Sequence, residues 1–172
     1  MRYLLAAAIT LATCTVAHAR PPACPPAGYD RARLEAPRTA DWAVADDAAR
    51  AALARALVAC VASPDTVYRD RLGYESLRRW MRAGALDNAT LLAIADDLQA
   101  RLTAREGPGF ERPFAALILS EVARTDRLHP WMTPARRASL LDAAITYLTG
   151  VRDYRGFDDR EGWRHGVPTG PT

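Results

Sequence analysis

Residues 87–102 decide the fold of this chain, and they read DNATLLAIADDLQARL. Apolar side chains recur along this stretch at spacings of three and four, namely at Leu91, Ile94, Leu98 and Leu102. That period places them on one face of an α-helix. Asp87 stands directly before the run, where its carboxylate can accept the free backbone N–H groups of a first helical turn. The stretch is therefore predicted to form an amphipathic helix that buries one face.

Four further segments repeat this pattern. They are residues 46–62, 65–82, 112–124 and a last helix that begins at Thr133-Pro134 and runs to about residue 152. Ser63-Pro64 and Thr133-Pro134 are typical helix starts, because Ser or Thr caps the free N–H groups and Pro is tolerated in the first turn. No run alternates polar and apolar residues as a half-buried strand does, so the fold class is predicted to be all-α.

The helix starts follow a regular spacing. Two helix pairs begin near residues 46 and 88, and the fifth long helix begins near residue 134, so the starts lie about 42 and 46 residues apart. HEAT and armadillo repeats, which consist of antiparallel helices, have this period. We therefore predict a HEAT/armadillo-like short α-solenoid of about five long helices, with an ordinary helical bundle as the alternative.

The fifth helix lacks a partner in this pattern. Its predicted apolar stripe consists of Leu141, Ala144, Leu148 and Val151. The last seven residues of the sequence include two Pro and two Gly, a composition that excludes a packed helix. We therefore expect one side of the stripe to be uncovered, which solenoids normally avoid with a capping element.

The N-terminus has the three features of a secretory signal peptide. Met1-Arg2 gives a positive start, residues 3–12 form an apolar run, and Ala17-His18-Ala19 provides small residues before a cleavage site. The apolar run is too short for a permanent transmembrane helix. We predict cleavage after Ala19 and a periplasmic or secreted protein. A lipoprotein anchored through Cys14 is the alternative, because residues 11–14 resemble a bacterial lipobox.

Cleavage would leave two cysteines, Cys24 and Cys60, in an oxidising compartment. We predict that they form one disulfide, which would tie the Pro-rich arm to the first long helix. A buried free thiol at Cys60 is the alternative.

Composition indicates one domain with a sizeable core, since 49% of the 172 residues are hydrophobic. The expected parts are a signal peptide (1–19), a Pro-rich arm with a short helix (20–44), a helical-repeat domain (45–152) and an aromatic, charged loop with an irregular tail (153–172). The basic residues, all Arg, number 23 against 20 acidic residues and are interleaved with them, so no nucleic-acid partner is predicted. The sequence has no Gly-rich phosphate loop, no Gly-x-Ser-x-Gly and no His-Glu-x-x-His, so neither catalytic residues nor a metal or cofactor are assigned.

Several motifs together resemble a bacterial family known as domain of unknown function 2785. The strongest are Gly109-Phe110 with residues 112–117, residues 119–127, Pro130-Trp131 with Thr133-Pro134, and the run from Tyr154 to His165. The weaker ones are residues 24–26, residues 68–70, and Tyr74-Glu75 with Trp80. The resemblance implies an all-helical, repeat-like domain without an established activity. It also implies further helices after the Gly-Trp-x-His segment, where this sequence departs from the family.

Two carboxylates are candidate functional residues within predicted helices. Glu121 lies among apolar residues, where a charge must be paired or its pKa shifted. It is interpreted either as a base or ligand in a cleft or as one partner of an ion pair with Arg112, Arg124 or Arg155. Glu75 has the same two interpretations, with Arg71, Arg78 and Arg79 near it in sequence.

The loop over residues 153–165 is dense in aromatic and charged side chains, and loops of this kind often carry function on a rigid scaffold. Its candidates are Arg155, Asp158 and His165, although their spacing matches no metal motif. The alternative is a structural cap in which the rings pack on helix ends and the charges pair.

The most consistent functional hypothesis is an exported scaffold that binds a peptide or protein partner in its concave face. One alternative is a hydrolase in which Glu75, Glu121 and His165 meet in one cleft. Another is a truncated, non-functional fragment of a longer protein.

Overall fold

The computed structural model describes residues 24–104 and 109–165. The six α-helices of this part are α1 (Arg31–Thr39), α2 (Asp47–Leu57), α3 (Glu75–Arg82), α4 (Asn88–Thr103), α5 (Glu111–Leu128) and α6 (Pro134–Gly150). A 3₁₀ segment, η1 (Val58–Ala62), and a π-helical segment, η2 (Val67–Tyr74), join α2 to α3. The all-α prediction is confirmed, because the sheet of the described part is a single hairpin of two-residue strands, β1 (Phe157–Asp158) and β2 (Gly162–Trp163).

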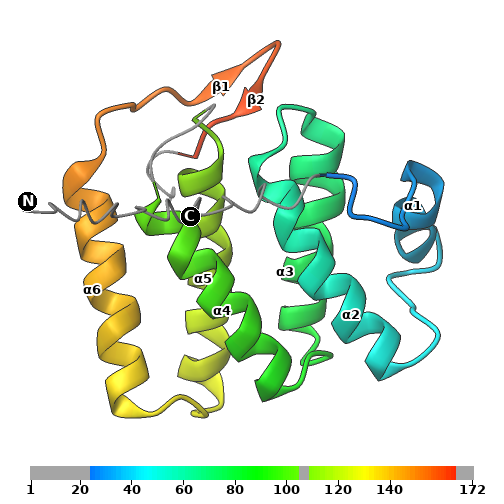
Figure 1. Ribbon diagram of the computed structural model, residues 1–172, viewed down its shortest axis with the longest axis horizontal. Helices are drawn as coiled ribbons and strands as arrows, with labels where there is room; N and C mark the ends of the chain where they lie inside the picture. Colours follow the sequence, from blue (N-terminus) through cyan, green and yellow to red (C-terminus); the bar gives the residue numbers. More distant parts are fainter. Residues whose placement is uncertain (1–23, 105–108, 166–172) are drawn as a thin grey trace, which may run out of the picture.

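The helices stand side by side in a row, with α1 at one end and α6 at the other (Figure 1). The central helix is α4, which packs along α5 and also contacts α2 and α6. The core between the helices includes the large buried side chains Trp80, Phe114, Leu57, Leu72, Leu77, Ile94, Leu98 and Ile118. The HEAT-like repeat remains a prediction. The order of the helices determines which helix faces pack against a neighbour and which are exposed.

Three helix starts follow the expected capping chemistry. The carboxylate of Asp46 accepts the N–H of Ala49, and that of Asp87 accepts the N–H of Thr90, both at 2.7 Å. At the start of α6, the Thr133 hydroxyl accepts the N–H of Arg136, and Pro134 occupies the first turn. These caps satisfy N–H groups that have no partner within the helix.

The predicted helix over residues 65–82 starts differently from the expectation. Ser63 accepts the N–H of Asp65, and the Asp65 carboxylate accepts the N–H of Val67 at 2.8 Å, so Asp65 takes the capping role expected of Ser63. The chain then widens into η2, which contains Gly73. A Cβ at Gly73 would lie 3.0 Å from the Tyr68 carbonyl oxygen and 3.4 Å from the Cβ of Cys60. The close approach of η2 to η1 therefore needs a residue without a side chain.

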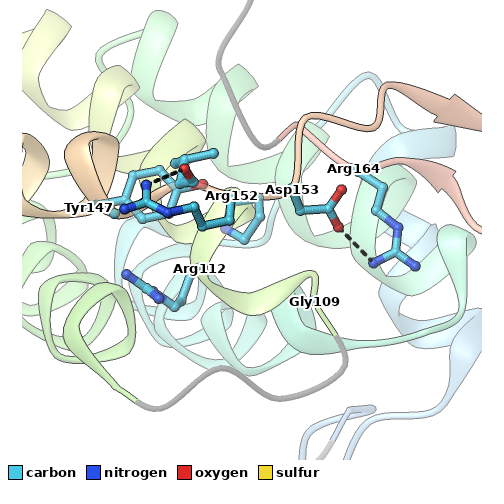
Figure 2. A pocket seen from close by; sticks show the side chains of 9 residues that line it. Gly109, Arg112, Tyr147, Arg152, Asp153 and Arg164 are labelled. Atoms are coloured by element: carbon cyan, nitrogen blue, oxygen red, sulfur yellow. Dashed lines mark hydrogen bonds and ion pairs between the residues drawn. The ribbon is translucent and has the colours of Figure 1, made fainter.

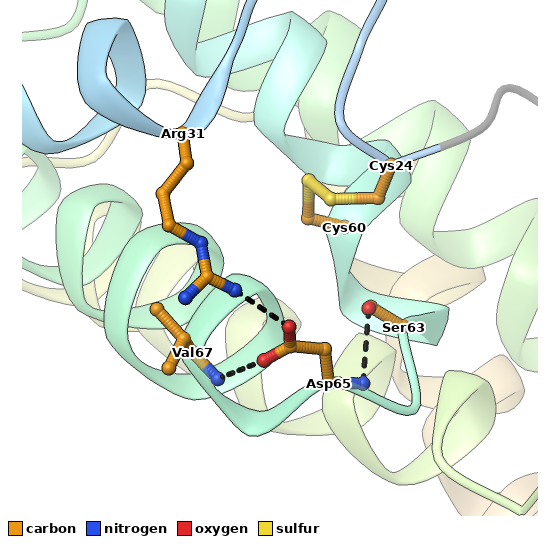
Figure 3. Close-up of a disulfide and its surroundings, with 6 residues drawn as sticks. All are labelled: Cys24, Arg31, Cys60, Ser63, Asp65 and Val67. Carbon is orange, nitrogen blue, oxygen red and sulfur yellow. Dashed lines mark hydrogen bonds and ion pairs between the residues drawn. A yellow bond between two sulfur atoms is a disulfide. The ribbon is translucent and has the colours of Figure 1, made fainter.

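A disulfide joins Cys24 to Cys60, which is compatible with the pairing expected from the sequence (Figure 3). Arg31 of α1 reinforces the same junction, because its guanidinium lies 2.6 Å from the Asp65 carboxylate. The two links tie the N-terminal arm and α1 to the η1–η2 connection, covering one end of the row.

The opposite end, α6, turns a different face to the core than the expected stripe. Ala143 and Tyr147 are its buried residues, whereas Leu141, Ile145 and Leu148 are 58%, 50% and 48% exposed. The stripe was expected to be uncovered on one side, and Leu141 and Leu148 are its exposed members, because α4 and α5 contact the neighbouring face of the helix. Leu141 and Leu148, together with Ile145, form an apolar row that no described element covers.

Other expectations fall outside the described residues. They concern the signal peptide (1–19), the alternative lipid anchor at Cys14, and the tail at 166–172. Within residues 24–104 and 109–165, no helix combines the length and apolarity that crossing a bilayer requires.

Candidate functional site

Glu121 is buried on α5 and pairs with Arg82 at the end of α3. The Arg82 guanidinium donates from Nε to Oε2 at 3.0 Å and from Nη2 to Oε1 at 2.5 Å. This two-pronged pair compensates the buried carboxylate and links the two helices. Sequence reasoning expected an ion pair but not this partner, because Arg82 lies 39 residues away in the chain.

Glu75 lies at the start of α3, with Arg78 and Arg79 each 3.9 Å from its carboxylate. Tyr74 is half-buried, and burial raises the pKa of its hydroxyl, with further contributions from Glu121 and Glu75. The charges of Glu75 on α3 and Glu121 on α5 thus both raise the pKa of the Tyr74 hydroxyl.

The C-terminal candidates lie in and beside the β1–β2 hairpin. Arg155 is exposed and binds Asp153 at 2.5 Å, and this pairing lowers the pKa of Asp153 to about 2. Asp158 accepts the N–H groups of Arg160 and Glu161 at 2.8 and 2.9 Å, which closes the hairpin turn.

His165 packs between two aromatic rings. Its ring centroid lies 5.2 Å from that of Phe114 in an edge-on arrangement and 5.7 Å from that of Trp163 in a stacked one. Burial lowers the pKa of the imidazole, and the charge of Arg69 lowers it further. The five candidates therefore sit in three places: beside Tyr74, in the hairpin, and on Phe114. Among the described residues, no three His, Cys, Asp or Glu side chains are placed to hold a metal ion.

Arg69 fixes the hairpin to the helices. It is fully buried, donates to the carbonyl oxygens of Ser63 and Glu161 at 3.1 and 2.6 Å, and lies 3.9 Å over the Phe110 ring. Arg164 lies 4.5 Å over the same ring, so two guanidinium groups contact Phe110. Cation–π contacts of this kind gain strength where water is excluded. This stack sets the position of the segment that follows α6.

An apolar groove runs between α5 and α6. Its volume is about 710 Å³, and its lining includes Ala116, Leu119 and Ala123 of α5 with Leu141, Ala144 and Leu148 of α6. At one end of the groove, Asp126 accepts two N–H groups, from Trp131 and Met132, and pairs with Arg137 at 2.5 Å. The other end is closed by Tyr147.

A second, smaller cavity lies beyond Tyr147, with a volume of about 240 Å³ (Figure 2). Its lining carries the guanidinium groups of Arg112, Arg152 and Arg164 and one carboxylate, that of Asp153. A Cβ at Gly109, whose φ is +90°, would lie 2.6 Å from Nη1 of Arg164. The glycine thus gives Arg164 its place at the cavity wall. We call this site the arginine cavity.

Neither the groove nor the arginine cavity was predicted from the sequence. The uncovered stripe on the last helix was a usable signal for the groove. The cavity had no local signal, because Arg112, Arg152 and Arg164 come from the start of α5, the end of α6 and the residue after β2.

The described residues thus form a helical protein with an apolar groove between α5 and α6 and a smaller cavity lined by arginines. Residues 98–170 match the model of the family described as "Protein of unknown function (DUF2785)", so this segment of the chain is similar to that family. The matched segment includes α5, α6 and the hairpin, and therefore most of the groove and cavity lining. No curated protein and no solved structure gives a significant match.

Proposed function

We propose that this chain is a binding module that takes an amphipathic, acidic α-helix of a partner protein into the α5–α6 groove. The observation that carries the proposal is the uncovered row Leu141, Ile145 and Leu148, which borders a groove floored by small alanines. These positions follow the i, i+4, i+7 spacing that meets the apolar face of another helix.

Covering this row would supply the driving force for binding. Each of the three side chains is about half exposed. Burying the exposed part against a partner would contribute about 1 kcal/mol per residue to the free energy of binding. The alanines of the floor allow close approach of a second helix. A bound helix would therefore bury its own leucines against both α5 and α6.

Charge complementarity favours an acidic partner. Along the groove, Arg137 neutralises Asp126, which leaves the exposed Arg127 as a positive group at the rim. The arginine cavity at the far end of the groove adds Arg152, whose guanidinium pairs with no carboxylate of the described residues. A helix with glutamates or aspartates flanking its apolar face matches this pattern, and such matching raises both specificity and association rate.

A second copy of the chain matches the groove less well. The sole carboxylate on α6 is Asp142, in the middle of the helix. A two-fold pairing of α6 with its copy would bring the half that carries Arg136 and Arg137 towards the arginine cavity. We therefore assign the groove to a different protein.

We further propose that binding takes place outside the cytosol and that residues 45–152 act as one helical-repeat domain. The signal-peptide pattern over residues 1–19 supports export, and the Cys24–Cys60 disulfide is compatible with it.

The experiment is a selection from a displayed library of amphipathic helices with fixed apolar positions and randomised flanking charges. Selected peptides are then measured for affinity to the wild-type chain and to Leu141→Glu, with Leu92→Glu as the matched control. Leu92 is an exposed leucine of α4 outside the groove, so both variants put one charge on an exposed position. We expect acidic flanks in the selected peptides and an affinity loss of about tenfold or more for Leu141→Glu, against less than about twofold for Leu92→Glu.

Circular dichroism of both variants verifies that they fold. The proposal is wrong if no helix is enriched, if the enriched helices carry basic flanks, or if Leu141→Glu and Leu92→Glu affect binding equally. It is also wrong if the chain forms a dimer that Leu141→Glu dissociates, because the groove would then hold a second copy.

A further inference from the structure

Arg152 is a guanidinium of the arginine cavity that pairs with no carboxylate of the described residues. Asp153 is the one carboxylate of the lining, and it is already engaged by Arg155 at 2.5 Å. Arg164 pairs with Glu161 and lies 3.9 Å from Asp153. Arg152 donates to the carbonyl oxygens of Thr149 and Val151, which orient its guanidinium without cancelling its charge. Arg152 therefore gives the cavity a positive charge that the carboxylate of the lining does not compensate.

Arg164 also has donor capacity that the described protein atoms do not use. Its side chain is more than nine-tenths buried, and its Nε–H is buried without a hydrogen-bond partner in the described part of the chain. A buried donor without an acceptor costs free energy, which an acceptor supplied by a ligand would recover. Figure 2 shows Arg164, Asp153, Arg152 and Arg112 around the same hollow.

The cavity and the groove meet at Tyr147, which lines both. We propose that the arginine cavity binds a carboxylate side chain near one end of the helix that occupies the α5–α6 groove. This inference rests on the proposed function, and it adds the chemical group that sets the register of the bound helix.

A carboxylate is the anion that a helix in the groove can supply to this cavity. Guanidinium groups bind carboxylates through paired, planar hydrogen bonds. Asp153 repels any anion in the cavity. The low pKa of Asp153 keeps that repulsion present throughout the neutral range.

The test compares two selected peptides that differ only by Glu→Gln at the position expected to reach the cavity, both with amidated C-termini. Affinities are measured for the wild-type chain, Arg152→Gln and Arg152→Lys, with Arg160→Gln as the charge-matched control. Arg160 is an exposed hairpin residue outside the cavity lining. We expect the wild type to prefer the Glu peptide by about tenfold, and Arg152→Gln to lose most of that preference. Arg160→Gln should keep it, and Arg152→Lys, which retains the charge but not the paired planar hydrogen bonds, should keep part of it.

Asp153→Asn gives a second, opposite prediction. Removing the carboxylate of the cavity should increase the preference for the Glu peptide, by about threefold or more. A cavity that serves only as structural packing would show no such gain.

Sodium acetate is the probe that separates this inference from the groove function. It is titrated into the chain against sodium chloride at equal ionic strength, while the Nε–H NMR signals of the arginines are followed. Saturable shifts of the Arg152 and Arg164 signals, absent for Arg160, support the cavity even if no helix binds in the groove. If helices bind in the groove but the Glu and Gln peptides bind equally and acetate produces no saturable shift, the inference is wrong and the groove function stands.

Discussion

Asp126 holds the α5–α6 turn together through contacts from three residues. One carboxylate oxygen accepts the N–H groups of Trp131 and Met132, and the other accepts Nε–H of Arg137 at 2.5 Å. The bond from Arg137, together with the two backbone bonds, holds the pKa of Asp126 well below its usual range. The residue thereby fixes the relative position of the two helices that form the groove.

We predict that Asp126→Asn lowers the free energy of unfolding at pH 7 by about 1–2 kcal/mol, because the charge-assisted bonds are lost while an oxygen acceptor remains. A depressed pKa in the folded state stabilises the protein above the pKa of the unfolded state, near 3.9, and loses this effect as the pH falls further. Urea unfolding should therefore show the wild type and the variant converging between about pH 4 and pH 2. A difference that is constant with pH would contradict this role of the Asp126 charge.

At the same scale, the sequence predicted which side chains are unusual better than it predicted their partners. The burial of Glu121 followed from its apolar neighbours along α5, but its partner Arg82 comes from α3 and depends on how two helices pack. The importance of Arg69 was not predicted, because its buried position requires the hairpin that returns from 92 residues away.

At the scale of elements, helix starts were the most predictable features, because a cap depends on residues three positions apart. Asp46, Asp87 and Thr133 all accept the N–H group three residues later. The π-helical segment η2 was not predicted, because no cap or spacing in residues 67–74 indicates it. Which face of α6 is buried was also decided by packing, since α4 and α5 select Ala143 and Tyr147.

The Cys24–Cys60 disulfide joins two elements, and its contribution to the stability of the fold can be measured. It closes a loop between residues 36 positions apart, for which the chain-entropy model gives a stabilisation of about 3–4 kcal/mol. We predict that reductant, or the variant Cys24→Ser, lowers the midpoint of thermal unfolding followed by circular dichroism. An unchanged midpoint under reducing conditions would contradict the link. Arg31→Gln, which removes the ion pair with Asp65 and the contact with the Tyr68 ring, should have a smaller effect.

At the scale of the whole molecule, one end of the helix row is covered by other segments and the other end exposes apolar side chains. The end at α1 is covered by the N-terminal arm, the disulfide and the Arg31–Asp65 pair. The end at α6 has an apolar row beside the groove and, next to Tyr147, the arginine cavity. The β1–β2 hairpin, at the top of Figure 1, is held to the helices by Arg69. The uncovered last helix could be expected from the count of helix starts. The groove and cavity as shapes needed the positions of α5, α6 and the hairpin together.

The central claim is that the α5–α6 face receives a partner helix, and hydrogen–deuterium exchange with and without a selected acidic helix tests it most directly. We predict that the peptide slows exchange in α5 and α6 and leaves α1, α2 and α3 unchanged. The same peptide added to the Leu141→Glu variant should not slow exchange in any helix. Protection confined to α1–α3 or to the hairpin, or protection in α5 and α6 that survives Leu141→Glu, would contradict the account.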